Sequence, residues 1–190
     1  MLALVLAYLI GSVNFGVIVP RAMGVDIYAH GSGNPGTSNV FRTVGKRAGA
    51  VVLFGDAVKG VIAAALGAVI VDPGFAYVTA LAAVVGHIVP VWHRFRGGRG
   101  VATALGAALY LQPVVGIVLI VMWTAVVLIW KTASVASLAA MVLYVPGFWL
   151  AGTRGASLAW TAVIALFVIV RHGGNIRRLS SGTERKMSAG

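Results

Sequence analysis

Long apolar stretches recur from the first residue of this 190-residue chain to about position 171, separated by short polar segments. A helix needs about 20 consecutive apolar residues to cross the hydrocarbon core of a bilayer, with roughly 17 to 25 usual. Charged residues make up only 10% of the chain, whereas an ordinary soluble domain has roughly 25%. The sequence therefore predicts an all-α integral membrane protein, with a single polytopic membrane domain over residues 1–190.

Seven apolar runs are candidates for transmembrane helices. Glycine, proline or charged residues bound them, and they fall at about residues 2–20, 48–71, 75–92, 98–111, 114–130, 134–151 and 155–171. The fourth run is short for a span. The alternative is therefore six spans, in which one long helix runs through Gln112-Pro113 and is kinked by the proline.

The distribution of Lys and Arg decides between these arrangements. With seven spans, Arg154 alone of the 15 basic residues lies on the same side as Asp72. With six spans, Lys131 and the basic tail move to the face opposite the basic loops, against the positive-inside rule. We therefore expect about seven helices, with the N-terminus outside and the C-terminus cytoplasmic. The net charge of +11 would then attract anionic membrane lipids and phosphorylated metabolites to the cytoplasmic face.

Composition and termini exclude several classes of function. The chain has no cysteine, which excludes a thiolate nucleophile, an iron-sulfur cluster and a disulfide framework. No soluble platform or base-stacking surface is evident, so we expect no nucleic-acid partner. The apolar start, residues 1–10, has no basic region before it, which favours a first span over a removed signal peptide.

The longest polar segment, residues 30–42, joins the first two spans and has the composition of a phosphate-binding loop. Its glycines let backbone amides converge on an anion, its hydroxyls can donate, and Arg42 can contact two phosphate oxygens at once. The alternative is a flexible Gly/Ser loop with one snorkelling arginine. The candidate binding residues here are Ser32, Gly33, Asn34, Gly36, Thr37, Ser38, Asn39 and Arg42.

Two further segments contain candidate residues. Asp56 and Lys59 lie one helical turn apart, which predicts a structural salt bridge for Asp56, and Lys59 can also add positive charge toward a bound phosphate. Residues 86–103 are rich in Gly and Arg and open the short fourth helix, which favours a second anion site at a helix N-terminus. The alternative is a basic interfacial turn whose glycines pack helices. The candidates in this segment are His87, Gly97, Gly98, Arg99 and Gly100.

The basic tail begins where the last span ends. His172 and Asn175 are three residues apart and share one helical face if Gly173-Gly174 does not break the helix. Ser134, at the start of the sixth run, is by residue type more often a helix-packing residue that bonds its own backbone.

Taken together, these segments resemble the bacterial acyl-phosphate:glycerol-3-phosphate acyltransferase family of the PlsY type. The first family motif resembles residues 31–42, the second residues 86–103, and the third Arg171-His172, Asn175-Ile176 and Gly182-Thr183-Glu184. The resemblance spans about residues 11–186. It implies a seven-helix fold in the bacterial inner membrane, a cytoplasm-facing site, and no metal or organic cofactor.

The resemblance also implies the reaction and the site. An acyl chain passes from acyl phosphate to the 1-hydroxyl of glycerol 3-phosphate and gives lysophosphatidic acid and phosphate, the first step of phospholipid biosynthesis. Phosphate contacts fall on Ser32, Arg42 and Arg99. The reaction centre falls on His172, Asn175 and Ser134, and Glu184 holds the tail in place.

Two questions stay open at the level of sequence. The proton of the attacking hydroxyl passes either to His172 or to a phosphate oxygen of a substrate, and we favour the substrate because no Asp or Glu is spaced to orient His172. The rival function is transport of a phosphorylated solute, since glycine breaks and arginines near a membrane are also features of transporters.

Overall fold

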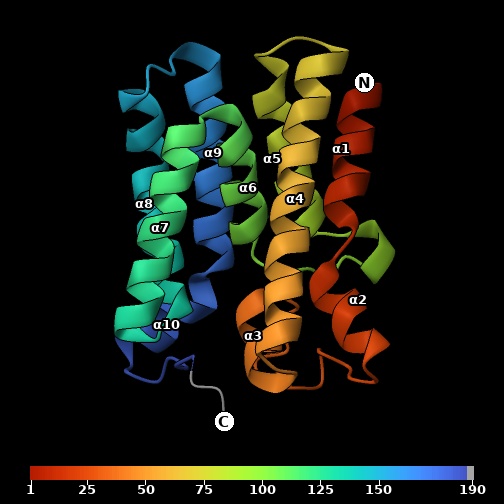
Figure 1. Ribbon diagram of the computed structural model, residues 1–190, viewed down its shortest axis with the longest axis vertical. Helices are drawn as coiled ribbons and strands as arrows, with labels where there is room; N and C mark the ends of the chain where they lie inside the picture. The colour runs from red at the N-terminus through yellow and green to blue at the C-terminus, as the bar shows by residue number, and fades with distance from the viewer. Residues whose placement is uncertain (188–190) are drawn as a thin grey trace.

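The computed structural model describes residues 1–187, and every regular element in that range is helical. The long helices run side by side, with the N-terminus at one end of the bundle and α10 at the other (Figure 1). The all-α prediction is confirmed. The elements in order are α1 (Leu2–Ser12), α2 (Phe15–Ala22), α3 (Thr37–Thr43), α4 (Lys46–Ile70), α5 (Phe75–Ile88), the 3-10 helix η1 (Val91–His93), α6 (Val101–Leu111), α7 (Pro113–Trp130), α8 (Ala133–Leu150), α9 (Gly155–Arg171) and α10 (Gly173–Ser180).

Five spans within residues 1–187 are long and apolar enough to cross a membrane, and a sixth results if α9 and α10, which meet at a bend of 55°, form one broken span. Helix α6 has only 11 residues. At 1.5 Å per residue it is about 16 Å long, roughly half the thickness of the hydrocarbon core. The count of seven spans therefore stays a prediction.

The first predicted span, residues 2–20, is two helices instead of one. Helix α1 ends at Ser12 and α2 begins at Phe15, because Val13 and Asn14 adopt non-helical backbone conformations. No proline or glycine occupies residues 12–14, so the sequence does not signal the break. The Val13 carbonyl accepts a hydrogen bond from the Lys59 ammonium at 2.8 Å. A buried charge on α4 thus satisfies a backbone group that the break exposes.

The chain reverses direction between the fourth and fifth apolar runs. Gln112 leaves the helical conformation, and Pro113 opens α7, where its missing N–H is not needed. A β-carbon at Gly116 of α7 would press against the backbone of Ala108 and Leu109 of α6. The two runs are therefore neighbouring antiparallel helices (Figure 1), and the alternative of one helix kinked at Gln112-Pro113 is wrong.

Glycines let the central helices approach closely. β-carbons at Gly60 and Gly106 would overlap the backbone carbonyls of Thr103 and Ala57, so α4 and α6 meet backbone to backbone. Small residues are typical of such crossings in membranes, where close packing rather than the hydrophobic effect drives helix association.

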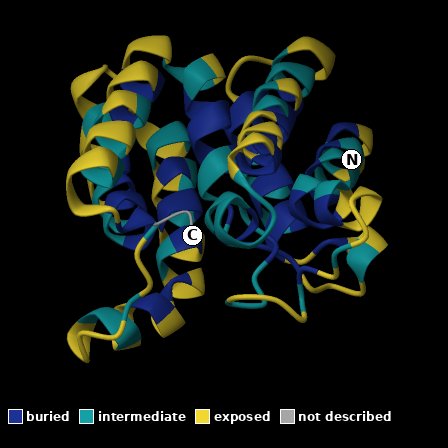
Figure 2. Cartoon of the chain, turned by 60° about the horizontal axis from the view of Figure 1, so that its bottom comes forward, coloured by how far each residue is buried: buried dark blue, intermediate teal, exposed yellow. Residues whose placement is uncertain are grey.

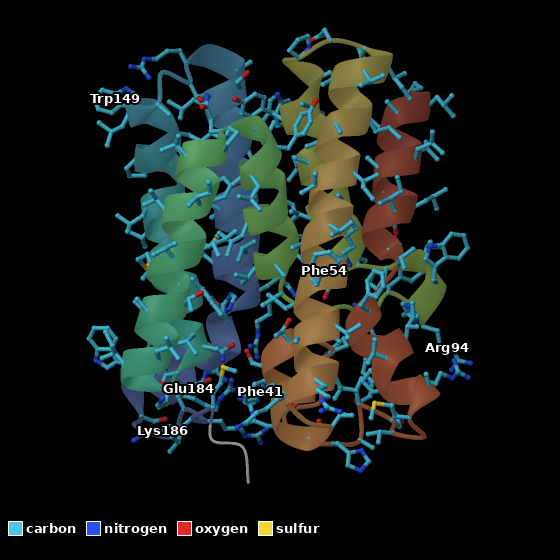
Figure 3. All side chains as sticks on the ribbon, viewed as in Figure 1. Phe41, Phe54, Arg94, Trp149, Glu184 and Lys186 are labelled. Atoms are coloured by element: carbon cyan, nitrogen blue, oxygen red, sulfur yellow. The ribbon has the colours of Figure 1, made fainter. Side chains whose placement is uncertain are left out.

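Apolar side chains cover much of the outside of the bundle. Exposed residues line its outward faces (Figure 2), and Phe54, labelled on α4 in Figure 3, is 73% exposed. Such a surface is suited to lipid. We call the part of the molecule formed by α2, α3, α10 and residues 94–100 the basic end. Arg154 lies at the opposite end, in the turn between α8 and α9.

Candidate active site

A cavity of about 160 Å³ extends from the basic end into the bundle, between α3, α4, α5, α6, α7, α8 and the α9–α10 junction. The structure therefore brings together the three polar segments singled out in the sequence. The predicted residues that line this cavity are Ser32, Asn34, Gly36, Thr37, Ser38, Asn39, Arg42, Asp56, His87, Arg99, Gly100, Ser134, His172, Asn175 and Glu184.

The loop before α3 is held in shape by Asn39. The Asn39 side chain accepts a hydrogen bond from the Ser32 amide at 2.9 Å and donates one to the His30 carbonyl at 3.0 Å. Gly31 and Gly33 have φ values of +60° and +66°, which glycine adopts without strain. Asn39 is 2% exposed, so it supports the loop from within, while Ser32 stays at the cavity.

Two guanidinium groups face the cavity from different elements. Arg42 lies in the last turn of α3, and Arg99 lies two residues before α6. Burial lowers the pKa of Arg99 to about 10, and burial also lowers the pKa of Arg42. Both side chains remain charged at neutral pH, and neither forms an ion pair within residues 1–187. Two unpaired positive charges in one cavity favour the binding of an anion.

The cavity contains no evident set of metal ligands. Within residues 1–187, no group of three His, Asp or Glu side chains is close enough together to hold a metal ion.

His172, from the third segment, and Ser134, from the start of α8, place two neutral polar groups near these charges. The His172 Nδ1–H donates to the Val168 carbonyl at 2.7 Å, so in the neutral ring Nε2 has a free lone pair. The Ser134 hydroxyl is buried and has no hydrogen-bond partner within residues 1–187. The cavity thus offers one acceptor and one free donor beside the two arginines.

The helix does not continue unbroken through Gly173-Gly174, which was the condition for His172 and Asn175 to share one helical face. Helix α9 ends at Arg171, and His172 lies at the bend where α10 begins. The Asn175 amide still donates to the His172 carbonyl at 2.8 Å. Both side chains therefore line the cavity even though they do not share one continuous helix.

Glu184 joins the tail to α10. Its carboxylate accepts a hydrogen bond from Asn175 Nδ2 at 2.7 Å and one from Arg178 Nε at 2.9 Å. The Met187 amide then donates to the Lys131 carbonyl in the turn between α7 and α8. The tail consequently crosses the basic end beside the cavity, where Glu184 and Lys186 are seen in Figure 3.

Three predicted glycines lie beside the main cavity. Gly33 and Gly97 line a second, more open hollow at the basic end, whose wall includes Arg96 and Arg171. Gly98 packs so closely on His87 that a β-carbon there would overlap the imidazole.

Lys59 does not line the cavity. It is 3% exposed, and its ammonium lies 2.7 Å from the Asp56 carboxylate. The predicted salt bridge is present, whereas the direct contribution of Lys59 to a phosphate site does not fit this position.

The sequence did not point to the apolar wall of the cavity. Leu53 and Thr124 line the cavity and are also exposed on the outside of the bundle, so the cavity reaches the surface between α4 and α7, with the short α6 behind. These side chains are ordinary residues of apolar helices and bear no motif. The wall comprises Leu53, Ala57, Val101, Ala102, Leu105, Ile120, Trp123, Thr124, Ala133 and Ser137, of which only Val101 and Ala102 belong to a predicted motif. At the polar end, Arg178 and Arg185 also line the cavity and were not among the predicted site residues.

Known proteins match this chain over almost its whole length. The family model described as glycerol-3-phosphate acyltransferase matches residues 1–182. The glycerol-3-phosphate acyltransferases of Rubrobacter xylanophilus and Burkholderia vietnamiensis are each 44% identical to it. These matches cover 97% and 98% of this chain and 94% and 90% of theirs.

Two solved structures of PlsY (YgiH), an integral membrane glycerol 3-phosphate acyltransferase, share the fold. The glycerol 3-phosphate form superposes with a TM-score of 0.92 at 37% identity and covers 97% of this chain and 94% of that one. The lysophosphatidic acid form gives 0.89 at 38% identity, with 97% and 93% covered. The resemblance carried by the three motifs is confirmed: this integral membrane protein belongs to the glycerol-3-phosphate acyltransferase family.

Proposed function

We propose that this protein transfers a fatty acyl group from acyl phosphate to the 1-hydroxyl of sn-glycerol 3-phosphate, giving lysophosphatidic acid and phosphate. One observation carries the proposal: a single cavity has two unpaired arginines at its polar end and an apolar wall that reaches the outside of the bundle. A product with a phosphate and an acyl chain matches both parts. The relatives' names and the two ligand forms of the solved structures support glycerol 3-phosphate as the acceptor and lysophosphatidic acid as the product.

The polar end would bind glycerol 3-phosphate. Arg42 supplies a planar fork that matches two phosphate oxygens, and Arg99 adds a second charge from the opposite loop. The backbone and hydroxyls of residues 32–38 supply further donors. The acyl chain would lie along the apolar wall, where Leu105 and Trp123 exclude water.

Acyl phosphate is a mixed anhydride with a good leaving group, so the site mainly has to align the hydroxyl with the carbonyl. The hydroxyl oxygen attacks the carbonyl carbon, the new ester bond forms, and the carbon–oxygen bond to phosphate breaks. The hydroxyl proton passes to a phosphate oxygen of a substrate. Before the attack, His172 Nε2 would accept a hydrogen bond from the hydroxyl and hold its oxygen near the carbonyl, and the hydroxyl would then turn its one proton to the phosphate oxygen as the ester bond forms. The free Ser134 hydroxyl would donate to the developing oxyanion.

The membrane orientation is part of the proposal. We place the basic end at the cytoplasmic face of the bacterial inner membrane, with seven crossings in one membrane domain, the N-terminus outside and the C-terminus inside. The positive-inside rule supports this orientation, because Arg154 is the one Lys or Arg at the opposite end of the described chain.

A cysteine at position 154 is therefore expected to react with a membrane-impermeant maleimide added outside intact cells. Because the chain has no cysteine, Arg154→Cys gives one reporter thiol, and Lys186→Cys at the other end is the matched control. The Arg154→Cys protein should keep its acyltransferase activity, since Arg154 contacts only Trp149 and Thr153 near its own turn. Labelling at 154 only after the cells are permeabilised would overturn the orientation.

Acyl phosphate should be the donor, and acyl-CoA should not replace it. Nothing in the sequence resembles a site for the coenzyme A nucleotide, and an acyl-CoA lacks the anionic phosphate directly on the carbonyl carbon that the basic end would attract. Losing one to two charge-assisted contacts predicts a loss of about a hundredfold or more in kcat/KM. Lysophosphatidic acid formation from each donor, followed by mass spectrometry, tests this. Equal rates with both donors would refute the donor assignment and leave the acceptor assignment in place.

A further inference from the structure

Asp56, Lys59 and His87 form a buried polar group behind the wall of the cavity. Lys59 Nζ lies 2.7 Å from the Asp56 carboxylate, 2.8 Å from the Val13 carbonyl and 2.9 Å from His87 Nδ1. The three side chains are 1%, 3% and 3% exposed. Of the three, Asp56 and His87 line the cavity and Lys59 does not.

These contacts determine where the proton lies on His87. An ammonium has three donors and no acceptor, and Lys59 Nζ lies at hydrogen-bond distance from both the Val13 carbonyl and His87 Nδ1. His87 Nδ1 must therefore accept. The distance from His87 Nδ1 to Asp56 is 3.6 Å, too long for a hydrogen bond that would place a proton there. The neutral imidazole then has its proton on Nε2.

The Nε2 side of the ring faces the loops that would bind the substrate. A β-carbon at Gly98 would overlap Nε2 and would lie 3.1 Å from the Pro35 carbonyl, so the ring edge lies where the two loops meet. The Gly98 amide donates to the His87 carbonyl at 3.1 Å. Within residues 1–187 the one hydrogen bond of the His87 ring is at Nδ1, so the Nε2 donor is free at a cavity that Arg99 also lines.

We infer that His87 is a neutral hydrogen-bond donor to the phosphate of the bound acceptor, and that Lys59 is its positioning residue. Lys59 does not touch the substrate. It holds His87 in the Nε2–H tautomer and, through the Val13 carbonyl, fixes the break between α1 and α2. This inference rests on the proposed acyltransferase function, and it explains why a charged lysine lies buried here without lining the cavity.

A pair of substitutions at His87 separates donation from packing. In H87N the shorter amide still reaches Lys59 but presents no donor at the Nε2 position, whereas the longer amide of H87Q restores a donor there. The KM for glycerol 3-phosphate should rise about tenfold in H87N, with the KM for acyl phosphate unchanged, and H87Q should recover most of that loss. Equal KM values in both variants and the wild type would overturn the role of His87.

The role of Lys59 is tested with the charge-balanced double variant D56N/K59M, which leaves no unpaired buried charge. The KM for glycerol 3-phosphate should rise about as much as in H87N. Nitrogen-15 NMR of labelled protein should show the Nε2–H form of His87 in the wild type and a mixture of tautomers in the double variant, with H87Q identifying the resonance among the four histidines. If D56N/K59M folds and keeps both the wild-type tautomer of His87 and the wild-type KM for glycerol 3-phosphate, Lys59 has only a structural role.

The tautomer measurement needs no turnover, so it distinguishes the two proposals. If the wild-type enzyme makes no lysophosphatidic acid, the proposed function fails. If it does and the His87 variants leave KM unchanged, only this inference fails.

Discussion

Replacing Arg42 with lysine is expected to raise the KM for glycerol 3-phosphate about tenfold to a hundredfold and to leave the KM for acyl phosphate unchanged. Arg42 faces the cavity from α3 without an ion-pair partner in residues 1–187. Lysine keeps the charge but loses the planar fork that contacts two oxygens at once. A charge-assisted hydrogen bond of this kind is worth about 1.5 to 3 kcal/mol, which gives the expected factor.

The matched control for this variant is Arg47→Lys. Arg47 lies in the first turn of α4, is exposed and does not line the cavity, so its replacement should leave both KM values unchanged. A loss of kcat larger than the rise in KM for Arg42→Lys would mean that Arg42 also orients the attacking hydroxyl. Unchanged kinetics with less folded protein in the membrane would show that Arg42 is only an anchor at the lipid surface.

The second large effect is expected at His172. His172→Ala should lower kcat about a hundredfold, because the attacking hydroxyl loses the acceptor that aligns it with the carbonyl. His172→Gln should recover to within about tenfold of the wild type, since the glutamine carbonyl can accept the same hydrogen bond near the Nε2 position. Steady-state kcat for both variants, at saturating concentrations of both substrates, gives the comparison.

The alanine and glutamine variants of His172 also show which group takes the proton of the attacking hydroxyl. Glutamine can accept a hydrogen bond but cannot act as a base near neutral pH. If the glutamine variant is as slow as the alanine variant, His172 itself removes the proton, and the assignment of that step to a substrate phosphate is wrong.

The polar segments of the site could be predicted because their composition is unusual for a membrane chain. Glycines, hydroxyls and arginines between apolar runs have little reason to occur together unless they bind something polar. Ser32, Arg42 and Arg99 were found this way, whereas the role of His172 came from the resemblance to the family. The structure brings all four to one cavity.

The remaining features depend on tertiary contacts that no local pattern encodes. The break at Val13-Asn14 has no glycine or proline and is stabilised by Lys59, 46 residues away. The burial of Lys59 could not be inferred either, because its partner His87 is on another helix. The apolar wall, with Leu53 and Trp123, consists of residues that any membrane helix contains.

The most direct test of the proposed function is phosphate release by the purified protein in detergent, with acyl phosphate and glycerol 3-phosphate supplied together and separately. We expect phosphate and lysophosphatidic acid in equal amounts, formed only when both substrates are present, and about tenfold to a hundredfold less kcat/KM for glycerol 3-phosphate in the Arg42→Lys protein. Phosphate release that does not depend on glycerol 3-phosphate would contradict acyl transfer to this acceptor. The absence of release from folded protein, together with uptake of labelled glycerol 3-phosphate into vesicles that contain it, would instead identify a transporter.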